Sequence, residues 1–309
     1  MKTLVVSPHT RYFLWQTEFS YYTFKKYNNR NREGNRDDYL CLLIDGNHQK
    51  EGKEAEDYEP IFSNQTVLPF HDYFGEKEKH LTPTASPINI ATAIKQWLDT
   101  TDYEGTIQII DPDCIFTRSF SENIKIVADE HYCFVDDIYD QWHLKVKDKN
   151  GLTAKWIEKK YCLSNPHLCR GGFVPIIIHS TSLRKIIDSW IEFNLKLLAD
   201  ESLRKDQIWW ANMYAFDFAC AEAGIHQIPR AMATVPGLLN HQDDEVLGHV
   251  IHYSVYPHGT FNKKTFMKDF QYHGSAFIKH LPDFNNATRA FKKEFIDFVQ
   301  HFRLIGNIF

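Results

Sequence analysis

Two carboxylates, Asp111 and Asp113, follow an apolar run and are separated by a single proline. The run at residues 106–110, Thr-Ile-Gln-Ile-Ile, indicates a buried strand that delivers both acids to its carboxyl-terminal edge. Open α/β sheets bind their ligands at that edge. Two carboxylates one residue apart can share a divalent metal and the oxygens of a diphosphate, because hard oxygen ligands suit Mg²⁺ and Mn²⁺. The motif therefore predicts a metal site or, equally, an ordinary Asp-Pro-Asp turn in which proline fixes φ.

Strand and helix patterns alternate around these acids and must hold them in place. Apolar runs predict strands at residues 3–7, 39–44, 106–110, 132–135, 173–179 and 249–253. Amphipathic spacing predicts helices at residues 12–27, 87–98, 182–198 and 205–223. We expect Ser180 or Thr181 to cap the third of these helices and Gly224 to end the fourth. Polar segments predict loops at residues 28–38 and 50–60, and residues 144–160 predict a hairpin or an irregular excursion around an Asn-Gly pair.

The composition is that of an ordinary globular protein, with 309 residues of which 43% are hydrophobic and 24% charged. A net charge of −5 gives no basic footprint, so nucleic acid is not an expected partner. No apolar run approaches the roughly 20 residues that span a bilayer, and the first residues resemble neither a signal peptide nor an anchor. Cys41, Cys114 and Cys133 lie in apolar runs that predict buried free thiols. We therefore expect a soluble, cytoplasmic protein in a reducing compartment.

Phenylalanines recur at helical spacing near the C-terminus, at Phe291, Phe295, Phe298 and Phe302. A stripe of this kind is typical of a packing face and far less typical of a cofactor site. The alternative use is a surface for a partner helix, through which the chain would form an oligomer.

Five segments carry a resemblance to a known family. The predicted helix after the first strand opens with Tyr-Phe-Leu-Trp-Gln at residues 12–16, and Asn89 stands eight residues before Trp97. The other three segments are Ile-Ile-Asp-Pro-Asp at 109–113, Trp-Ala-Asn-Met-Tyr-Ala-Phe at 210–216, and Ile-His-Tyr-Ser at 251–254 with Phe-Asn-Lys at 261–263. In this order, over about residues 3–267, they resemble the hydroxyproline O-arabinosyltransferases and peptidyl-serine α-galactosyltransferases of plants and algae.

The resemblance implies a fold and an activity. The fold is a single GT-A domain over residues 1–270, Rossmann-like with a mostly parallel sheet, and a helical tail over residues 271–309 that packs on it or extends it. The activity is that of a metal-dependent glycosyltransferase, which moves a galactose- or arabinose-like sugar from a UDP-sugar to a hydroxyl group on a glycan or peptide. These relatives retain the anomeric configuration, so a retaining enzyme is implied. Because no second pair of acids like that of retaining glycosidases is evident, we expect a front-face mechanism in which the leaving phosphate assists deprotonation of the acceptor.

The resemblance also implies roles for particular residues at the metal and nucleotide. Asp113 would bind Mn²⁺ (or Mg²⁺), Asp111 would contact the ribose or the metal, and His252 would be a third metal ligand. Imidazole favours Mn²⁺ over Mg²⁺. For His252 the alternative is a buried histidine bonded to backbone. Lys263, with Lys264 as its rival, would offset charge on the departing UDP, unless both are simply solvated.

Further roles concern the nucleotide pocket and the sugar. Trp15 and Gln16 would help to form the uridine pocket, although Trp15 could equally anchor its helix to the sheet, and Asn89 is a further donor-binding candidate. Gly171 and Gly172 would contact the sugar or acceptor, with a simple turn as the alternative. The candidate catalytic residues, which would contact the donor sugar or stabilise positive charge at its anomeric carbon, are Asp206, Gln207 and Asn212. Asp206 and Gln207 could otherwise serve as a helix cap.

The chain departs from the family pattern at three positions. Ile90 and Ala91 replace the family lysine and proline after Asn89, and Asn212 replaces the glutamate of Glu-Met-Tyr. A carboxylate beside the sugar is thus lost or moved, with Asp206, six residues earlier, as a substitute. These changes motivate a second hypothesis, a non-catalytic sugar-nucleotide or glycan-binding protein derived from such an enzyme. A metal-dependent phosphohydrolase is a weaker third, because no His-x-His or Asp-rich cluster is present.

Overall fold

The computed structural model describes residues 1–28, 39–45, 65–69, 86–118, 130–136, 159–161, 163–170, 173–200, 211–234, 248–253 and 286–305. The predicted loops at residues 29–38 and 50–60, and residues 144–158 of the predicted hairpin, lie outside these ranges.

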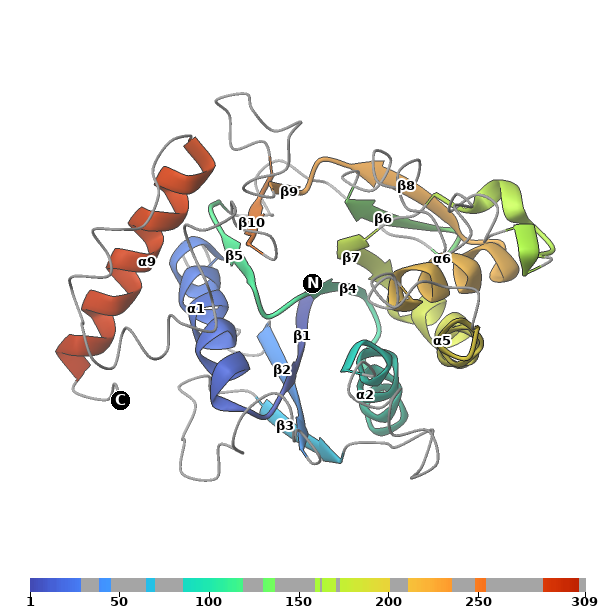
Figure 1. Cartoon of the computed structure of the whole chain (residues 1–309), viewed down its shortest axis with the longest axis horizontal. Helices are drawn as coiled ribbons and strands as arrows, with labels where there is room; N and C mark the ends of the chain where they lie inside the picture. The colour runs from blue at the N-terminus through green and yellow to red at the C-terminus, as the bar shows by residue number, and fades with distance from the viewer. Residues whose placement is uncertain are drawn as a thin grey trace.

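A seven-stranded sheet forms the centre of the molecule (Figure 1). Its strands, in the spatial order β3-β2-β1-β4-β7-β6-β8, are β3 (Gln65–Pro69), β2 (Tyr39–Asp45), β1 (Lys2–Pro8), β4 (Thr106–Ile110), β7 (Phe173–His179), β6 (Tyr132–Asp136) and β8 (His226–Arg230). β7 runs antiparallel to β4 and to β6, and the other neighbouring pairs are parallel. The prediction of a mixed α/β fold with a mostly parallel sheet is therefore confirmed.

A second, three-stranded sheet pairs the segment that follows the Asp-Pro-Asp motif with strands from the C-terminal half of the chain. It contains β5 (Cys114–Phe116), β10 (Val250–His252) and β9 (Ala233–Thr234). β10 pairs antiparallel with β5 and parallel with β9. Because β5 follows β4 after a short turn, this sheet brings residues near 250 to the carboxyl-terminal edge of β4.

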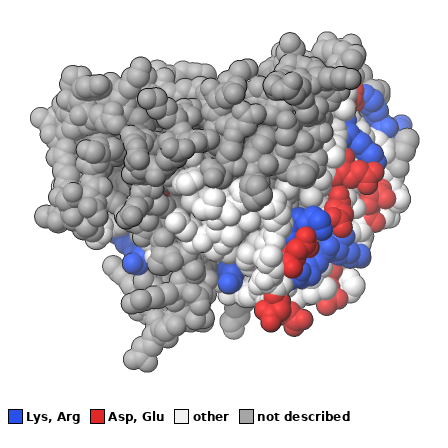
Figure 2. All heavy atoms as spheres, turned by 90° about the horizontal axis from the view of Figure 1, so that it is seen from below, with Lys and Arg blue, Asp and Glu red and all other residues white. Residues whose placement is uncertain are grey.

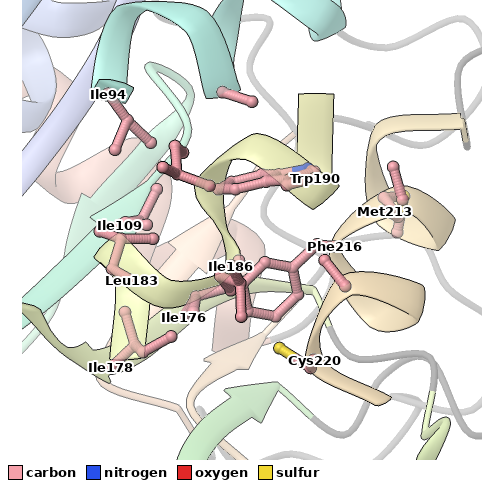
Figure 3. Close-up of a cluster of buried hydrophobic side chains, with 14 of the residues drawn as sticks. Ile94, Ile109, Ile176, Ile178, Leu183, Ile186, Trp190, Met213, Phe216 and Cys220 are labelled. Atoms are coloured by element: carbon pink, nitrogen blue, oxygen red, sulfur yellow. The ribbon is translucent and has the colours of Figure 1, made fainter. Parts of the chain in front are cut away.

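One face of the large sheet is covered by α2 (Ser86–Thr100), α5 (Ser180–Leu198) and α6 (Ala211–Ala223). The short 3-10 helix η4 (Pro166–Leu168) lies against α6. Alternate strand residues point toward these helices and form the main apolar core, shown in part in Figure 3. Ile109, Trp190 and Phe216 are at most 2% exposed there. This core holds β4 firmly, and β4 delivers the two acids.

The opposite face is covered by α1 (Arg11–Asn28), with the small sheet beside it and α9 (Asn286–Ile305) on the outside of α1 (Figure 1). The predicted phenylalanine stripe serves packing here: Phe291 and Phe295 are fully buried, and both lie edge-on to Phe19 of α1. Phe298 stacks on the same ring at a centroid distance of 4.9 Å. The last helix thus packs its aromatic face on the first helix of the chain.

Two details of the helix ends test the sequence predictions. Gly224 ends α6 with φ +70, as predicted. The prediction that Ser180 or Thr181 caps α5 is wrong, because the helix begins at Ser180 and His179 is the cap, its ring nitrogen accepting the Thr181 N–H at 3.3 Å. The Ser180 hydroxyl instead accepts the Gly105 N–H at 3.1 Å and ties the helix start to β4.

Four strands, β3, β5, β8 and β9, were not predicted. Each is short, and β3 and β8 are the edge strands of the large sheet, with mixed polar sequences that give little apolar periodicity.

The described surface is mixed in charge. Figure 2 shows basic and acidic side chains side by side on one face. Lys95 of α2, for example, pairs with Asp99 at 3.4 Å and with Asp188 of α5 at 3.2 Å. Among the helices that the structure describes, none has the length and apolar content needed to cross a bilayer.

Candidate metal centre

The Asp-Pro-Asp motif forms a tight turn between the two sheets. The Cys114 N–H donates to the Asp111 carbonyl at 3.1 Å, which closes a four-residue turn with Pro112 at its second position. Proline suits that position because its ring fixes φ near −65°. β5 begins at once, so both acids stand between the end of β4 and the start of β5. The motif is therefore a turn, and the turn presents two carboxylates at the sheet edge.

His252 lies on β10, the strand that pairs with β5, and its side chain approaches both carboxylates. Its Nε2 lies 3.2 Å from Asp113 Oδ1 and 3.5 Å from Asp111 Oδ2. Side-chain exposure is 6% for His252, 14% for Asp113 and 21% for Asp111. The neighbouring Tyr253 N–H donates to the Asp113 carbonyl at 3.0 Å and fixes the strand against the turn. His252 Nε2 thus lies beside carboxylate oxygens, which is the arrangement expected if the three side chains bind the same metal ion.

The three side chains fit a divalent cation. Two ligand atoms about 2.1 Å from one ion stand roughly 3.0–3.4 Å apart in octahedral or tetrahedral geometry. The observed separations of 3.2 and 3.5 Å are close to those values. Two carboxylates and an imidazole form a mixed oxygen and nitrogen set that suits Mn²⁺. The remaining exposure of the acids leaves one side of the group open to a ligand.

Cys114 lies beside this group and is fully buried. It is directly opposite His252 in the ladder between β5 and β10. Asp113, Cys114 and His252 each offer a ligand atom, and these atoms lie within 4.8 Å of one another. Burial, followed by the charges of Asp113 and Asp111, raises the pKa of the Cys114 thiol well above its usual value. Without a bound cation the thiol is therefore protonated at neutral pH.

An aromatic cluster supports the strand that carries His252. Tyr253 is fully buried, with ring centroids 4.9 Å from Phe291, 6.2 Å from Phe19 and 6.4 Å from Trp15. Trp15 is 2% exposed within this cluster, so the structure gives it the packing use that the sequence left open. Gln16, the next residue, is also buried. Their predicted contact with uridine stays a prediction.

A small pocket lies on the other side of Asp111. It is lined by Val6, Ile90, Ile109, Ile110, Asp111, Val174, Ile176, Trp190, Asn212, Met213 and Phe216. Figure 3 shows how Trp190, Met213 and Phe216 approach one another from α5 and α6. Asn212 accepts a hydrogen bond from Asn194 Nδ2 at 3.1 Å, and its backbone carbonyl accepts the Trp190 indole N–H at 3.1 Å. Asp111 and Asn212 thus line the same pocket. Asn89 is buried, and its predicted contact with the donor stays a prediction.

Five of the predicted site residues lie outside the described part of the chain. They are Asp206, Gln207, Gly171, Gly172 and Lys263. Lys264, the alternative to Lys263, is also outside it.

Two neighbours of the centre were missed by sequence reasoning. Cys114 was predicted only as a buried free thiol, which the structure confirms, and not as a neighbour of the metal ligands, although it directly follows Asp113. Asp136 ends β6, and its carboxylate accepts the backbone N–H groups of Met232 and Ala233, each at 2.8 Å. A carboxylate at the end of a predicted strand was a usable signal for Asp136. Only the three-dimensional pairing of β5 with β10 reveals the position of Cys114.

The family of this chain follows from a match to a known family model. Residues 1–229 match the sequence model of the hydroxyproline O-arabinosyltransferase family N-terminal domain. The chain belongs to this family. Membership in the arabinosyltransferase family confirms the predicted resemblance and the predicted enzyme class, glycosyltransferase. The fold is mixed α/β with a mostly parallel seven-stranded sheet, as predicted. The comparison with curated proteins gave no match.

Several solved structures are similar to this family member. The bifunctional glycosyltransferase WbbM is 12% identical with a TM-score of 0.49, over 95% of this chain and 51% of the WbbM chain. An active-site mutant of LgtC is 10% identical with a TM-score of 0.49, over 91% of this chain and 95% of the other. Mouse xyloside xylosyltransferase 1 is 11% identical with a TM-score of 0.43, over 82% and 97%. This chain therefore spans about half the length of WbbM.

Proposed function

We propose that this chain is a metal-dependent, retaining glycosyltransferase that moves a sugar from a UDP-sugar to a hydroxyl group on a glycan or peptide. The observation that carries the proposal is the meeting of Asp111 and Asp113 with His252, within 3.5 Å, at the carboxyl-terminal edge of β4. Ligands of open α/β sheets bind at that edge. Family membership supplies the reaction class, and this group of side chains supplies a place for the metal and the diphosphate.

The proposed metal ligands are Asp111, Asp113 and His252, with Mn²⁺ as the preferred ion. When bound, such an ion would screen the charge of the diphosphate as UDP leaves. Asp111, which lies 3.5 Å from His252 Nε2 and also lines the pocket, is the proposed contact for the ribose or the ion. Because strand pairing and the 3.0 Å bond from Tyr253 fix these side chains, they need little rearrangement to bind.

We propose that the donor sugar binds near Asp111 and Asn212 and not inside the pocket that both line, because that cavity of about 10 Å³ has room for about one water molecule. Its wall is mostly apolar, and Asn212 offers an amide that can hydrogen-bond a sugar hydroxyl while its own oxygen is held by Asn194. Among the described residues of this wall, Asp111 is the carboxylate. The proposed mechanism is a front-face one, in which the leaving phosphate assists deprotonation of the acceptor hydroxyl. Asp206, Gln207, Gly171, Gly172 and Lys263 keep the sugar- and phosphate-binding roles that the family pattern implies, as proposals.

Release of UDP from a UDP-sugar and a suitable acceptor tests this function. We expect release with Mn²⁺ present, loss of release in EDTA, and loss in Asp113→Ala. Asp99→Asn is the matched control, because Asp99 is an acid on the surface of α2, 58% exposed, and away from the centre. Full activity in EDTA and in Asp113→Ala would reject a metal-dependent transferase.

The second candidate is a non-catalytic binding protein derived from such an enzyme. Asn212 favours it, because an amide stands where the family has glutamate. Calorimetry separates the two functions. A binding protein of this kind would bind glycan with an affinity that Mn²⁺ and UDP leave unchanged, whereas an enzyme would bind UDP more tightly with Mn²⁺.

A further inference from the structure

A second set of metal ligands shares two side chains with the proposed Mn²⁺ site. Asp113 and His252 belong to both sets, and Cys114 replaces Asp111 in the second. The three ligand atoms already lie within 4.8 Å of one another without an ion. The two strands place Cys114 and His252 directly opposite one another, so both side chains project from the same face of the small sheet.

The second set of ligands is softer than the first, because the Cys114 sulfur replaces a carboxylate oxygen of Asp111. A thiolate, an imidazole and a carboxylate are ligands that Zn²⁺ takes in tetrahedral sites with a fourth position open, and thiolates favour Zn²⁺ and similar cations over Mg²⁺ or Mn²⁺. Zn²⁺ also binds mixed nitrogen, oxygen and sulfur sites more tightly than Mn²⁺ in general. An ion bound between the three side chains would draw the sulfur toward the other two ligand atoms.

We propose that Asp113, Cys114 and His252 form a site for a thiophilic cation, Zn²⁺ or Cd²⁺, which competes with Mn²⁺ for the centre. The inference rests on the proposed function because the two sites share Asp113 and His252. Occupation by the soft cation would remove both residues from the Mn²⁺ site, so Zn²⁺ would inhibit the transferase rather than support it.

Binding at this site is a simple exchange of a proton for a metal ion. The S–H bond of Cys114 breaks as the sulfur–metal bond forms, and the proton leaves to the buffer. No electron is transferred, so no oxidant or reductant is needed.

Cys41 provides a matched control for this proposal. It is fully buried on β2, as Cys114 is on β5, and both belong to the same apolar cluster. Among the described residues, no acid or histidine groups with Cys41 to form a candidate metal site. A substitution at Cys41 therefore tests for the general effect of removing a buried thiol.

The experiment is a titration of the full-length chain with Cd²⁺, followed by the ultraviolet charge-transfer absorption of the cadmium–thiolate bond and by calorimetry. We expect the wild-type chain and Cys41→Ser to develop the thiolate band with the first equivalent of Cd²⁺. Cys114→Ser and Cys114→Ala should lack it. Their Cd²⁺ affinity should fall at least about tenfold, the lower end of what loss of even an outer-shell partner costs, and by more than their Mn²⁺ affinity.

Each result has a definite meaning. A thiolate band that persists in both Cys114 variants, or that is absent from the wild-type chain, overturns the soft-metal site. If the wild-type chain binds Mn²⁺ and releases UDP but shows no band, the proposed function stands and this inference fails. If the band appears and depends on Cys114 but Mn²⁺ does not bind, the proposed function fails instead. Cys114→Ala guards against misfolding caused by a buried hydroxyl group in Cys114→Ser.

Discussion

The motif that contains Asp111 and Asp113 is both a turn and a candidate metal site. The sequence left a turn and a metal site as equal alternatives. The structure contains the turn, closed by the bond from Cys114 to the Asp111 carbonyl, and the turn aims both acids at His252. Proline fixes the backbone, and the fixed backbone places the carboxylates. Turn chemistry is therefore the means by which the candidate metal site is built.

Gly224 offers a test at the scale of one residue that is independent of the metal. Its φ is +70, and a Cβ added there would meet no atom within 4 Å. Gly224→Ala should therefore lower the free energy of unfolding by about 1–2 kcal/mol through backbone strain alone. Urea denaturation measures this change.

Gly224→Asn is the control, because asparagine tolerates the left-handed region better than alanine. It should lower the free energy of unfolding less than Gly224→Ala does. Equal stability of the alanine variant and the wild-type chain would contradict the strained conformation at this helix end.

Among the secondary-structure elements, two very short strands, β9 and β10, determine the position of His252. β9 holds β10 through paired backbone groups, and Asp136 holds the start of β9 to the end of β6. Gly248 allows the close approach of the two strands, because a Cβ there would stand 2.4 Å from the Met232 carbonyl oxygen. The large sheet thus positions His252 through a chain of backbone contacts.

Asp136→Ala should weaken Mn²⁺ binding although Asp136 is not a proposed metal ligand. The substitution removes the acceptor of two backbone N–H groups, so β9 and the strand that carries His252 lose their anchor. We expect the dissociation constant for Mn²⁺ to rise by about tenfold. Calorimetry or the electron paramagnetic resonance signal of free Mn²⁺ measures it.

Asp136→Asn distinguishes the loss of the hydrogen bonds that anchor β9 from a general loss of folding. Its amide oxygen can still accept both N–H groups, so most of the Mn²⁺ affinity should return. An Asp136→Ala variant that is folded and binds Mn²⁺ like the wild-type chain would show that β9 does not need this anchor.

At the scale of the whole molecule, the two ends of the chain are joined by α1 and α9. Lys26 Nζ lies 2.6 Å from Glu294 and 2.7 Å from Asp297, and the Tyr27 hydroxyl donates to Glu294 at 2.6 Å. Burial alone would lower the pKa of Lys26, but hydrogen bonds to Asp297 and Glu294 outweigh it and raise the pKa. Burial and the bond to Glu294 raise the pKa of Tyr27.

These shifts predict a loss of stability at alkaline pH. Below about pH 10, Lys26 and Tyr27 are protonated in the folded and the unfolded chain, so their contribution is complete. As the pH rises further, the unfolded chain releases these protons first, and the free energy of unfolding falls. Urea denaturation from pH 8 to pH 11 should show a steeper fall for the wild-type chain than for a variant carrying Lys26→Met and Tyr27→Phe. Equal slopes would show that the contacts of Lys26 and Tyr27 with α9 do not stabilise the fold.

The sequence predicted the strands and helices with strong apolar periodicity, among them β1, β4, β7 and α5. It missed β3, β5, β8 and β9, because very short strands, and edge strands with mixed polar residues, depend on their neighbours for pairing. Asp111, Asp113 and His252 were predicted together through the family resemblance. Cys114 and Asp136 were missed as neighbours of the centre, because their places depend on strand register and on long-range bonds. The boundary of the GT-A domain at residue 270 stays a prediction.

We propose that Asp111, Asp113 and His252 together hold one metal ion. Pulsed electron paramagnetic resonance of bound Mn²⁺ tests it most directly, because the spectrum reports nitrogen atoms coordinated to the ion. We predict one imidazole nitrogen coupled to Mn²⁺ in the wild-type chain, its loss in His252→Gln, and greatly weakened Mn²⁺ binding in Asp113→Asn. An imidazole signal that survives in His252→Gln, or Mn²⁺ binding that is unchanged in Asp113→Asn, would contradict the account.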